Sequence, residues 1–274
     1  NIVLDPIFIY GLSMGVKGAA LATILSQAVS CLWVLRFLRG KTTLLKLQKS
    51  TIGLSRKVIV PCIMLGMSTF VMQASESVIA VCFNSSLKHY GGDLAVGAMT
   101  ILTSVMQFAM LPLQGLGQGA QPITSYNYGA KKPDRVRKTY KLLLRVCLTY
   151  SVLFWAAVML MPRVFAGIFT PNPELLDFTA KVMRIYFGGV VIFGIQMSCQ
   201  MTFVSIGYAG CSITVAVMRK FILLLPLIYL MPHLVDNPTM GVYMAEPIAD
   251  VLAVTFTAIL FSVQFRKALK KLEN

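Results

Sequence analysis

Long apolar stretches separated by short polar segments run through this chain from end to end. Seven of them are long enough to cross a bilayer as helices, at about 20 residues per crossing, and a shorter one occupies 1–10. The seven lie near 13–38, 58–83, 94–126, 142–162, 183–206, 212–232 and 243–264. The pattern predicts an all-α integral membrane protein, a polytopic helical bundle with seven complete spans in this chain and the end of an eighth.

Basic residues gather in segments on alternate sides of these predicted spans. Four segments, 36–57, 131–145, 219–220 and 266–271, hold 20 of the 25 lysines and arginines. Because basic loops are retained in the cytoplasm, we expect a multi-pass protein of the plasma (inner) membrane with a cytoplasmic C-terminus. The net charge of +15 then reflects topology, and we expect no nucleic acid partner.

The composition supports a membrane protein. Hydrophobic residues make up 57% of the chain, charged residues only 13%, and the mean hydropathy is +0.74, outside the range typical of soluble domains. The first residue is Asn1, so we expect the chain to start inside a longer protein. The sequence contains no Ser/His/Asp, Cys/His or nucleotide-binding arrangement, which argues against an enzyme and against a bound cofactor.

The most specific chemical motif lies at the start of the chain. Asn1 and Asp5 are spaced i, i+4 and share one helical face. Pro6 has no amide hydrogen, so the carbonyl of Ile2 loses its helical partner and is free to act as a ligand. A carboxylate, an amide oxygen and a carbonyl suit a hard cation such as Na⁺, and the carboxylate also suits a proton. The alternative is that Asp5 only caps a helix end at the membrane surface.

A second acidic residue, Glu76, lies in the middle of a predicted span. A charge there costs about 2.5–3.5 kcal/mol if it faces lipid, so we expect it to face a cavity or to be protonated. The alternative is an acid satisfied by polar neighbours within the bundle. A role for Glu76 in binding a cationic substrate is implied by the family resemblance given below, and the further residues predicted to bind substrate are Gln73, Gln107, Gln200 and Tyr208.

Two other patterns favour structural roles. Glu246 and Asp250 lie one helical turn apart near the start of the last span, where a carboxylate interacts favourably with the helix dipole. The alternative is that the two carboxylates bind a cation together. Gly115 and Gly119 are spaced as a small-xxx-small face for helix packing.

Two segments resemble the multidrug and toxic compound extrusion (MATE) family: NIVLDPIFIYGLSMGVKGAALATILSQ and QGLGQGAQPITSYNYGAKKPDRVRK. The resemblance covers the whole chain, from the end of the fifth helix of the family to its twelfth. It implies two six-helix lobes around a central cleft in the complete protein. The implied divisions are the end of the N-lobe (1–40), a basic cytoplasmic linker (41–57), the C-lobe (58–266) and a cytoplasmic tail (267–274).

The resemblance also implies site residues. In many bacterial members the N-lobe cation site includes an N-x-x-x-D motif, which Asn1 and Asp5 match, and a threonine, which falls at Thr23. In a subset of the family a carboxylate on the tenth helix follows a Gly-Tyr pair. Here no carboxylate follows Gly207-Tyr208 closely, which argues against a second cation site in the C-lobe.

From the residues and the resemblance we predict a monomeric antiporter that exports organic cations by alternating access, coupled to Na⁺ or H⁺. A lipid-linked sugar flippase of related architecture is one alternative. It would place several basic residues in the cleft, whereas the mid-span residues look mostly neutral or acidic. A non-transporting membrane scaffold is another, but it gives no reason for acidic residues within the spans.

Overall fold

The chain is helical throughout the part that the structure describes. The computed structural model describes residues 1–40, 53 and 55–273, so most of the predicted linker 41–57 lies outside the described residues. The helices are α1 (Leu4–Pro6), η1 (Ile7–Gly11), α2 (Gly15–Leu38), α3 (Arg56–Gly129), α4 (Pro133–Leu160), α5 (Pro162–Gly167), α6 (Pro173–Tyr186), η3 (Phe187–Ile192), α7 (Phe193–Ser205), α8 (Ala209–Val217), η4 (Met218–Leu224), α9 (Leu225–Leu234) and α10 (Pro238–Glu273).

The chain forms two compact units, Asn1–Cys62 and Ile63–Asn274, and each is described by itself. In the first unit a π-helical turn, η1, directly follows Pro6. The turn lies against α2 at Gly18, where an added Cβ would be 2.8 Å from the backbone of Phe8. The missing side chain at this position therefore allows the irregular turn to pack on α2.

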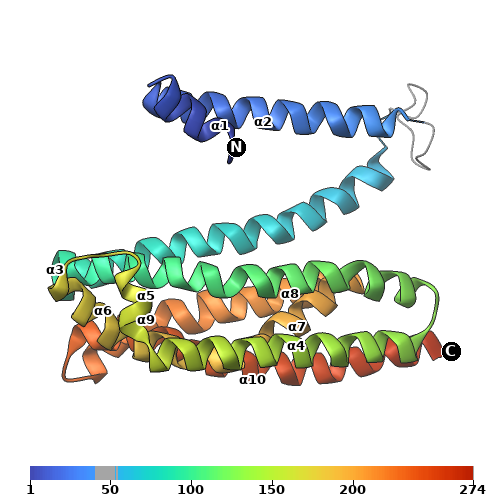
Figure 1. Ribbon diagram of the computed structural model, residues 1–274. Coiled ribbons are helices and arrows are strands. Elements are labelled where there is room, and N and C mark those ends of the chain that lie inside the picture. The colour runs from blue at the N-terminus through green and yellow to red at the C-terminus, as the bar shows by residue number, and fades with distance from the viewer. Residues whose placement is uncertain (41–52, 54, 274) are drawn as a thin grey trace. The chain divides into compact units, whose positions relative to one another are not determined.

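The helix α3 contains two of the predicted spans, and the chain reverses its direction within it (Figure 1). Gly92, with φ 65° and ψ −159°, interrupts the helix, in a conformation that glycine adopts without a steric penalty. Six described helices are long and apolar enough to cross a membrane, and one of them is the stretch Ala74–Gly129. At 56 residues this stretch is too long for one crossing; it contains the end of the predicted span 58–83 and the whole of the predicted span 94–126, joined at Gly92.

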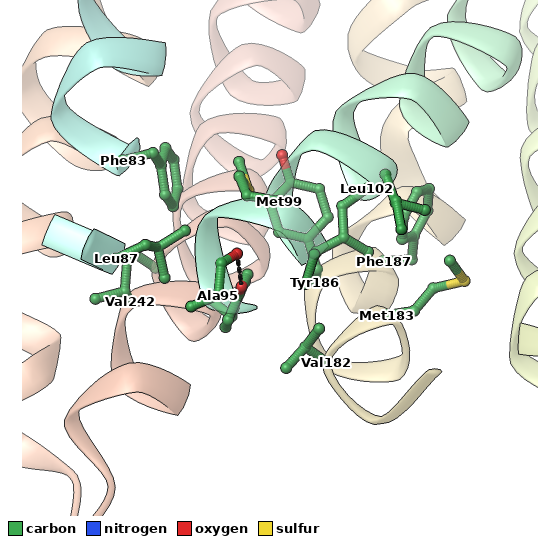
Figure 2. Packing of buried hydrophobic residues seen from close by; sticks show 14 of the residues in the cluster. Phe83, Leu87, Ala95, Met99, Leu102, Val182, Met183, Tyr186, Phe187 and Val242 are labelled. Carbon is green, nitrogen blue, oxygen red and sulfur yellow. Dashed lines mark hydrogen bonds between the residues drawn. The ribbon is translucent and has the colours of Figure 1, made fainter. Parts of the chain in front are cut away.

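A large apolar cluster surrounds the reversal in α3 and joins it to α6, η3 and α10. Figure 2 shows its labelled members: Phe83, Leu87, Ala95, Met99, Leu102, Val182, Met183, Tyr186, Phe187 and Val242. The Tyr243 hydroxyl donates to the Ala95 carbonyl at 2.7 Å, and the Thr239 hydroxyl donates to the Tyr90 carbonyl at 3.0 Å. Two backbone carbonyls beside the break are thus satisfied by the first turns of α10, which holds this end of the bundle together.

Large apolar side chains also cover much of the outside of the second unit. Exposed examples on its long helices are Val81, Phe108, Leu111, Leu142, Leu153 and Ile259. Water-soluble proteins rarely expose so much contiguous apolar surface, whereas lipid tails solvate it at no cost. The apolar helices and their outward faces together describe an integral membrane protein in contact with a bilayer.

Close packing along α3 uses Gly117 rather than the predicted pair Gly115 and Gly119. A Cβ added at Gly117 would be 2.6 Å from Cγ of Met201 on α7, whereas no atom of the described residues lies within 4 Å of a Cβ at either predicted position. An i, i+4 spacing shows which residues share a face but not which face meets a neighbouring helix.

Candidate functional site

The predicted cation site in the first unit contains a carboxylate oxygen that lacks a donor. Asp5 belongs to α1, and its amide donates to the Asn1 carbonyl at 2.8 Å. Its side chain is partly buried, and among the described residues Oδ1 has no hydrogen-bond partner. Because a buried polar atom without a partner is costly, a cation or a proton at this oxygen would stabilise it.

The third predicted residue, Thr23, lies on α2 and donates its hydroxyl hydrogen bond to the Ala19 carbonyl at 3.0 Å. No described hydrogen bond joins Thr23 to Asp5, and a site built from Asn1, Asp5 and Thr23 stays a prediction.

The second unit contains a cluster of charges inside the spans. Arg219 and Lys220 lie in η4, between α8 and α9 and within the apolar stretch Gly210–Leu234. Both side chains are buried. Their assignment to a cytoplasmic loop was therefore wrong. A basic residue is stable at this depth only if it is paired.

Arg219 is paired with two carboxylates of α10. Its Nη2 lies 2.8 Å from Oε1 of Glu246 and 2.6 Å from Oδ1 of Asp250, and its Nε donates to the same Oδ1 at 2.8 Å. The guanidinium also lies over the Phe193 ring, 4.9 Å from its centre, a favourable cation–π geometry. One arginine thus bridges two carboxylates that the i, i+4 spacing places on one face of α10.

Glu246 and Asp250 therefore do not serve the helix dipole, contrary to the prediction. α10 begins at Pro238, about two turns before Glu246, and the dipole effect is confined to the first turn. Both side chains are almost fully buried. α10 approaches closely enough because η3 has a glycine at the contact: a Cβ at Gly189 would be 2.8 Å from Cβ of Asp250.

Lys220 is paired with Glu76, the predicted substrate-binding residue. Its Nζ lies 3.0 Å from Oε2 of Glu76, and the two side chains differ strongly in exposure, 9% for the lysine and 60% for the glutamate. The pair joins η4 to α3. Together with Arg219, Glu246 and Asp250 it forms what we call the charge cluster, which contains two cations and three carboxylates and carries a formal charge of −1 with all five groups ionised.

A small cavity of about 60 Å³ lies within this cluster. It has room for water molecules but not for a drug-sized molecule, which needs roughly 300 Å³ or more. Its lining residues are Ser75, Glu76, Phe193, Gln196, Gln200, Ala216, Arg219 and Lys220. The buried Oε1 of Gln196 has no hydrogen-bond partner among the described residues. The cavity is thus polar, and it lies at the base of an exposed carboxylate.

The structure brings together only some of the residues predicted to bind substrate. Glu76 and Gln200 line the same cavity. Gln107 is exposed on α3, and Tyr208 packs against a separate apolar cluster. Gln73 lies in α3, and its side chain is outside what the structure describes. A shared site for all five residues stays a prediction, supported most directly for Glu76 and Gln200.

Sequence reasoning missed Arg219, Lys220 and Gln196 as site residues. For the basic pair a signal was present, because it stands within a predicted span and the next span carries two acidic residues. Opposite charges in neighbouring membrane helices tend to pair. For Gln196 the sequence offers no comparable signal, since a single amide in an apolar helix has many possible surroundings.

Comparison with known proteins places this chain among transport proteins. The family model MatE matches residues 68–230, more than half of the chain. Multidrug export protein MepA of Staphylococcus aureus (strain NCTC 8325 / PS 47) is 24% identical over 195 residues, which cover 71% of this chain and 43% of that protein. MepA of Staphylococcus saprophyticus is 22% identical over 262 residues, covering 95% and 57%. The chain spans about half the length of the curated relatives it matches.

Solved structures share the fold over nearly the whole chain. A MATE protein crystallised in a bent conformation has a TM-score of 0.90 at 23% identity, covering 100% of this chain and 60% of that one. The outward-facing form of a multidrug resistance MATE transporter of the MOP superfamily scores 0.89 at 24% identity, covering 98% and 60%. A third structure is that of a MOP superfamily transporter from Pyrococcus furiosus, described as having a binding pocket of reverse polarity that suggests a different function. Its TM-score is 0.90 at 24% identity, covering 98% of this chain and 60% of that one.

Proposed function

This chain belongs to the MATE family of membrane transporters, and from this we propose that the protein exports organic cations by alternating access, in exchange for Na⁺ or H⁺. The observation that carries the proposal is the charge cluster, in which three carboxylates are balanced by only two cations. A surplus negative charge within membrane-spanning helices favours a cation as the ligand. We assign the organic cation to Glu76, the carboxylate that is open to solvent.

We assign the coupling ion to the first unit. The donor-free Oδ1 of Asp5 can accept a proton or ligate Na⁺, with the Asn1 side chain as a second ligand. Exchange requires only that the ion and the organic cation stabilise different states of the protein. No direct contact between the two sites is needed for coupling of this kind.

The test uses the complete protein that contains this chain, reconstituted in liposomes with imposed Na⁺ or H⁺ gradients. Asp5→Asn keeps the size and polarity of the side chain but removes its charge. Gradient-driven efflux of tetraphenylphosphonium should fail in this variant, while equilibrium binding of the same cation persists. Asp236→Asn, in an exposed segment between α9 and α10, is the matched control. Efflux by Asp5→Asn at the control rate under both gradients would show that Asp5 does not couple transport.

We also propose that the C-terminus is cytoplasmic and that the protein lies in the inner membrane. Without Arg219 and Lys220, the three remaining basic segments still hold 18 of the 25 basic residues, which supports the orientation. A cysteine introduced at the exposed Lys132 should be protected from an impermeant reagent in intact cells. A cysteine at Glu174, which lies in the first turn of α6 and follows the span formed by α4, should react. The reverse pattern would invert the topology.

A lipid-linked sugar flippase is the second candidate, and the buried basic pair is the observation that favours it. A flippase would use such residues to hold a lipid phosphate. In this cluster, however, Arg219 and Lys220 are each bonded to a carboxylate, which reduces their availability to an anion. Liposomes distinguish the candidates: a flippase moves a fluorescent phosphate-bearing lipid and not tetraphenylphosphonium, the proposed exporter does the opposite, and a scaffold moves neither.

A further inference from the structure

The pair formed by Lys220 and Glu76 is accessible from only one side. The glutamate side chain is 60% exposed, whereas that of the lysine is 9% exposed. The Glu76 carboxylate can therefore be approached on its exposed side, while Lys220 is enclosed behind it. At that carboxylate a dissolved cation meets an ammonium group of the protein itself, held 3.0 Å from Oε2. Any cation that binds Glu76 must compete with this tethered group.

A displaced Lys220 can turn into the polar cavity of about 60 Å³ that both basic residues line. The buried Oε1 of Gln196, in the same lining, has no hydrogen-bond partner among the described residues and can accept a hydrogen bond from the ammonium. The ammonium can thus move without being left unpaired in an apolar interior, which would be costly.

We propose that Lys220 is an internal competitor for the substrate carboxylate: an organic cation binds Glu76 by displacing Lys220, which then turns into the polar cavity toward Gln196. This inference rests on the proposed function, since it takes Glu76 as the binding carboxylate. The cation itself remains at the exposed side of Glu76, because the cavity behind it is too small for a drug-sized molecule.

The mechanism selects among cations by their cost of dehydration. A small, strongly hydrated cation loses much of its hydration on binding, while Lys220 already occupies the carboxylate. A bulky organic cation with dispersed charge loses little hydration and gains apolar contacts. Because a ligand must displace Lys220, it needs a higher intrinsic affinity for Glu76. Lipophilic monovalent cations meet this requirement most easily.

The test measures equilibrium binding of tetraphenylphosphonium to the complete protein in detergent. Lys220→Gln removes the competitor and should tighten binding by about 3- to 10-fold, the range expected for a partly exposed ion pair. Glu76→Gln should weaken binding by a similar factor. The double variant should bind like Glu76→Gln alone, because the lysine acts only through the glutamate. Lys181→Gln, at an exposed lysine of α6, is the control for loss of one positive charge.

The outcomes separate this inference from the proposed function. If Glu76→Gln leaves binding unchanged, Glu76 is not the substrate carboxylate and both ideas fall. If Glu76→Gln weakens binding but Lys220→Gln does not tighten it, the competitor is disproved and the proposed function stands. If Lys220→Gln does not fold, the binding affinity of Lys220→Arg tests the proposal instead. A guanidinium holds a carboxylate more firmly than an ammonium does, so this variant should bind more weakly, and equal or tighter binding would overturn the proposal.

Discussion

Asp5 in the first unit and Asp250 in the second are both carboxylates within apolar, membrane-type helices, yet their surroundings differ. Asp5 lies beside a proline and a π-helical turn, and its Oδ1 has no partner among the described residues. Asp250 is more deeply buried; its Oδ1 receives two contacts from Arg219, and only its Oδ2 has no partner among the described residues. An irregular backbone thus leaves one carboxylate ready to bind an ion, while a helix pair supplies the other with a permanent countercharge. The proposed function assigns the coupling ion to the first unit and the organic cation to the second.

The largest effect on stability is expected from removing the countercharge of Glu246 and Asp250. Arg219→Leu leaves Glu246 and Asp250 buried without their cation, and it should lower the free energy of unfolding by about 3–5 kcal/mol. Thermal and denaturant unfolding in detergent measure the effect. Neutralising both acids in the same chain, with Glu246→Gln and Asp250→Asn, should recover most of the loss because the three groups act as a unit.

Arg163→Leu is the matched control for that experiment. Arg163 lies 2.8 Å from Asp177, but both side chains are mostly exposed. Exposed pairs contribute little to stability, so this variant should unfold almost like the unmodified protein. Equal destabilisation by Arg219→Leu and Arg163→Leu would show that burial does not increase the contribution of the charge cluster to stability.

A smaller effect is expected from the contact that brings α10 to Arg219. In Gly189→Ala the new Cβ would lie 2.8 Å from Cβ of Asp250 and 3.2 Å from Cα of Pro247, so η3 and α10 must separate. We expect a loss of about 1–3 kcal/mol, the usual cost of overpacking. Gly115→Ala has open space around the added methyl group and should be neutral or stabilising by up to about 1 kcal/mol. A loss for Gly115→Ala as large as that for Gly189→Ala would contradict the packing argument.

The smallest effect is expected at Asp5. Its carboxylate has no described cation partner to lose, so Asp5→Asn should change the free energy of unfolding by less than about 1 kcal/mol. Asp250→Asn, which weakens an ion pair, should cost clearly more under the same conditions. If the two variants proved equally destabilising, Asp5 would be a structural residue and the contrast between the units would disappear.

Helix positions could be predicted well from the apolar pattern. The stretch predicted at 13–38 corresponds to α2, Gly15–Leu38, and the last stretch lies within α10. Membrane helices satisfy their backbone hydrogen bonds within one segment, so local composition and length decide where they form. The boundary between the second and third spans was predicted less well: residues 84–91 continue the helix and only Gly92 interrupts it, because polar composition alone does not stop a helix.

The candidate sites were predicted unequally. The motif of Asn1, Asp5 and Pro6 is local, and its main consequences, a shared face and an irregular turn, follow from spacing and from the missing proline amide. The charge cluster is not local. Lys220 and Glu76 are 144 residues apart, and Arg219 and Asp250 are 31 apart. Their pairing depends on which helix faces meet, which no periodicity within one helix reveals.

Hydrophobic patterning and residue spacing were sufficient for the apolar helices, for the family resemblance and for the possibility of an ion site at Asp5. The partner of each buried charge was decided only by the packing of helices, since the interaction energy of two charges depends on their distance and on the surrounding dielectric. Glu246 illustrates the limit. As a residue near a helix start it looked like a dipole partner, and it became part of a buried ion network because Gly189 lets α10 approach and η4 places Arg219 beside it.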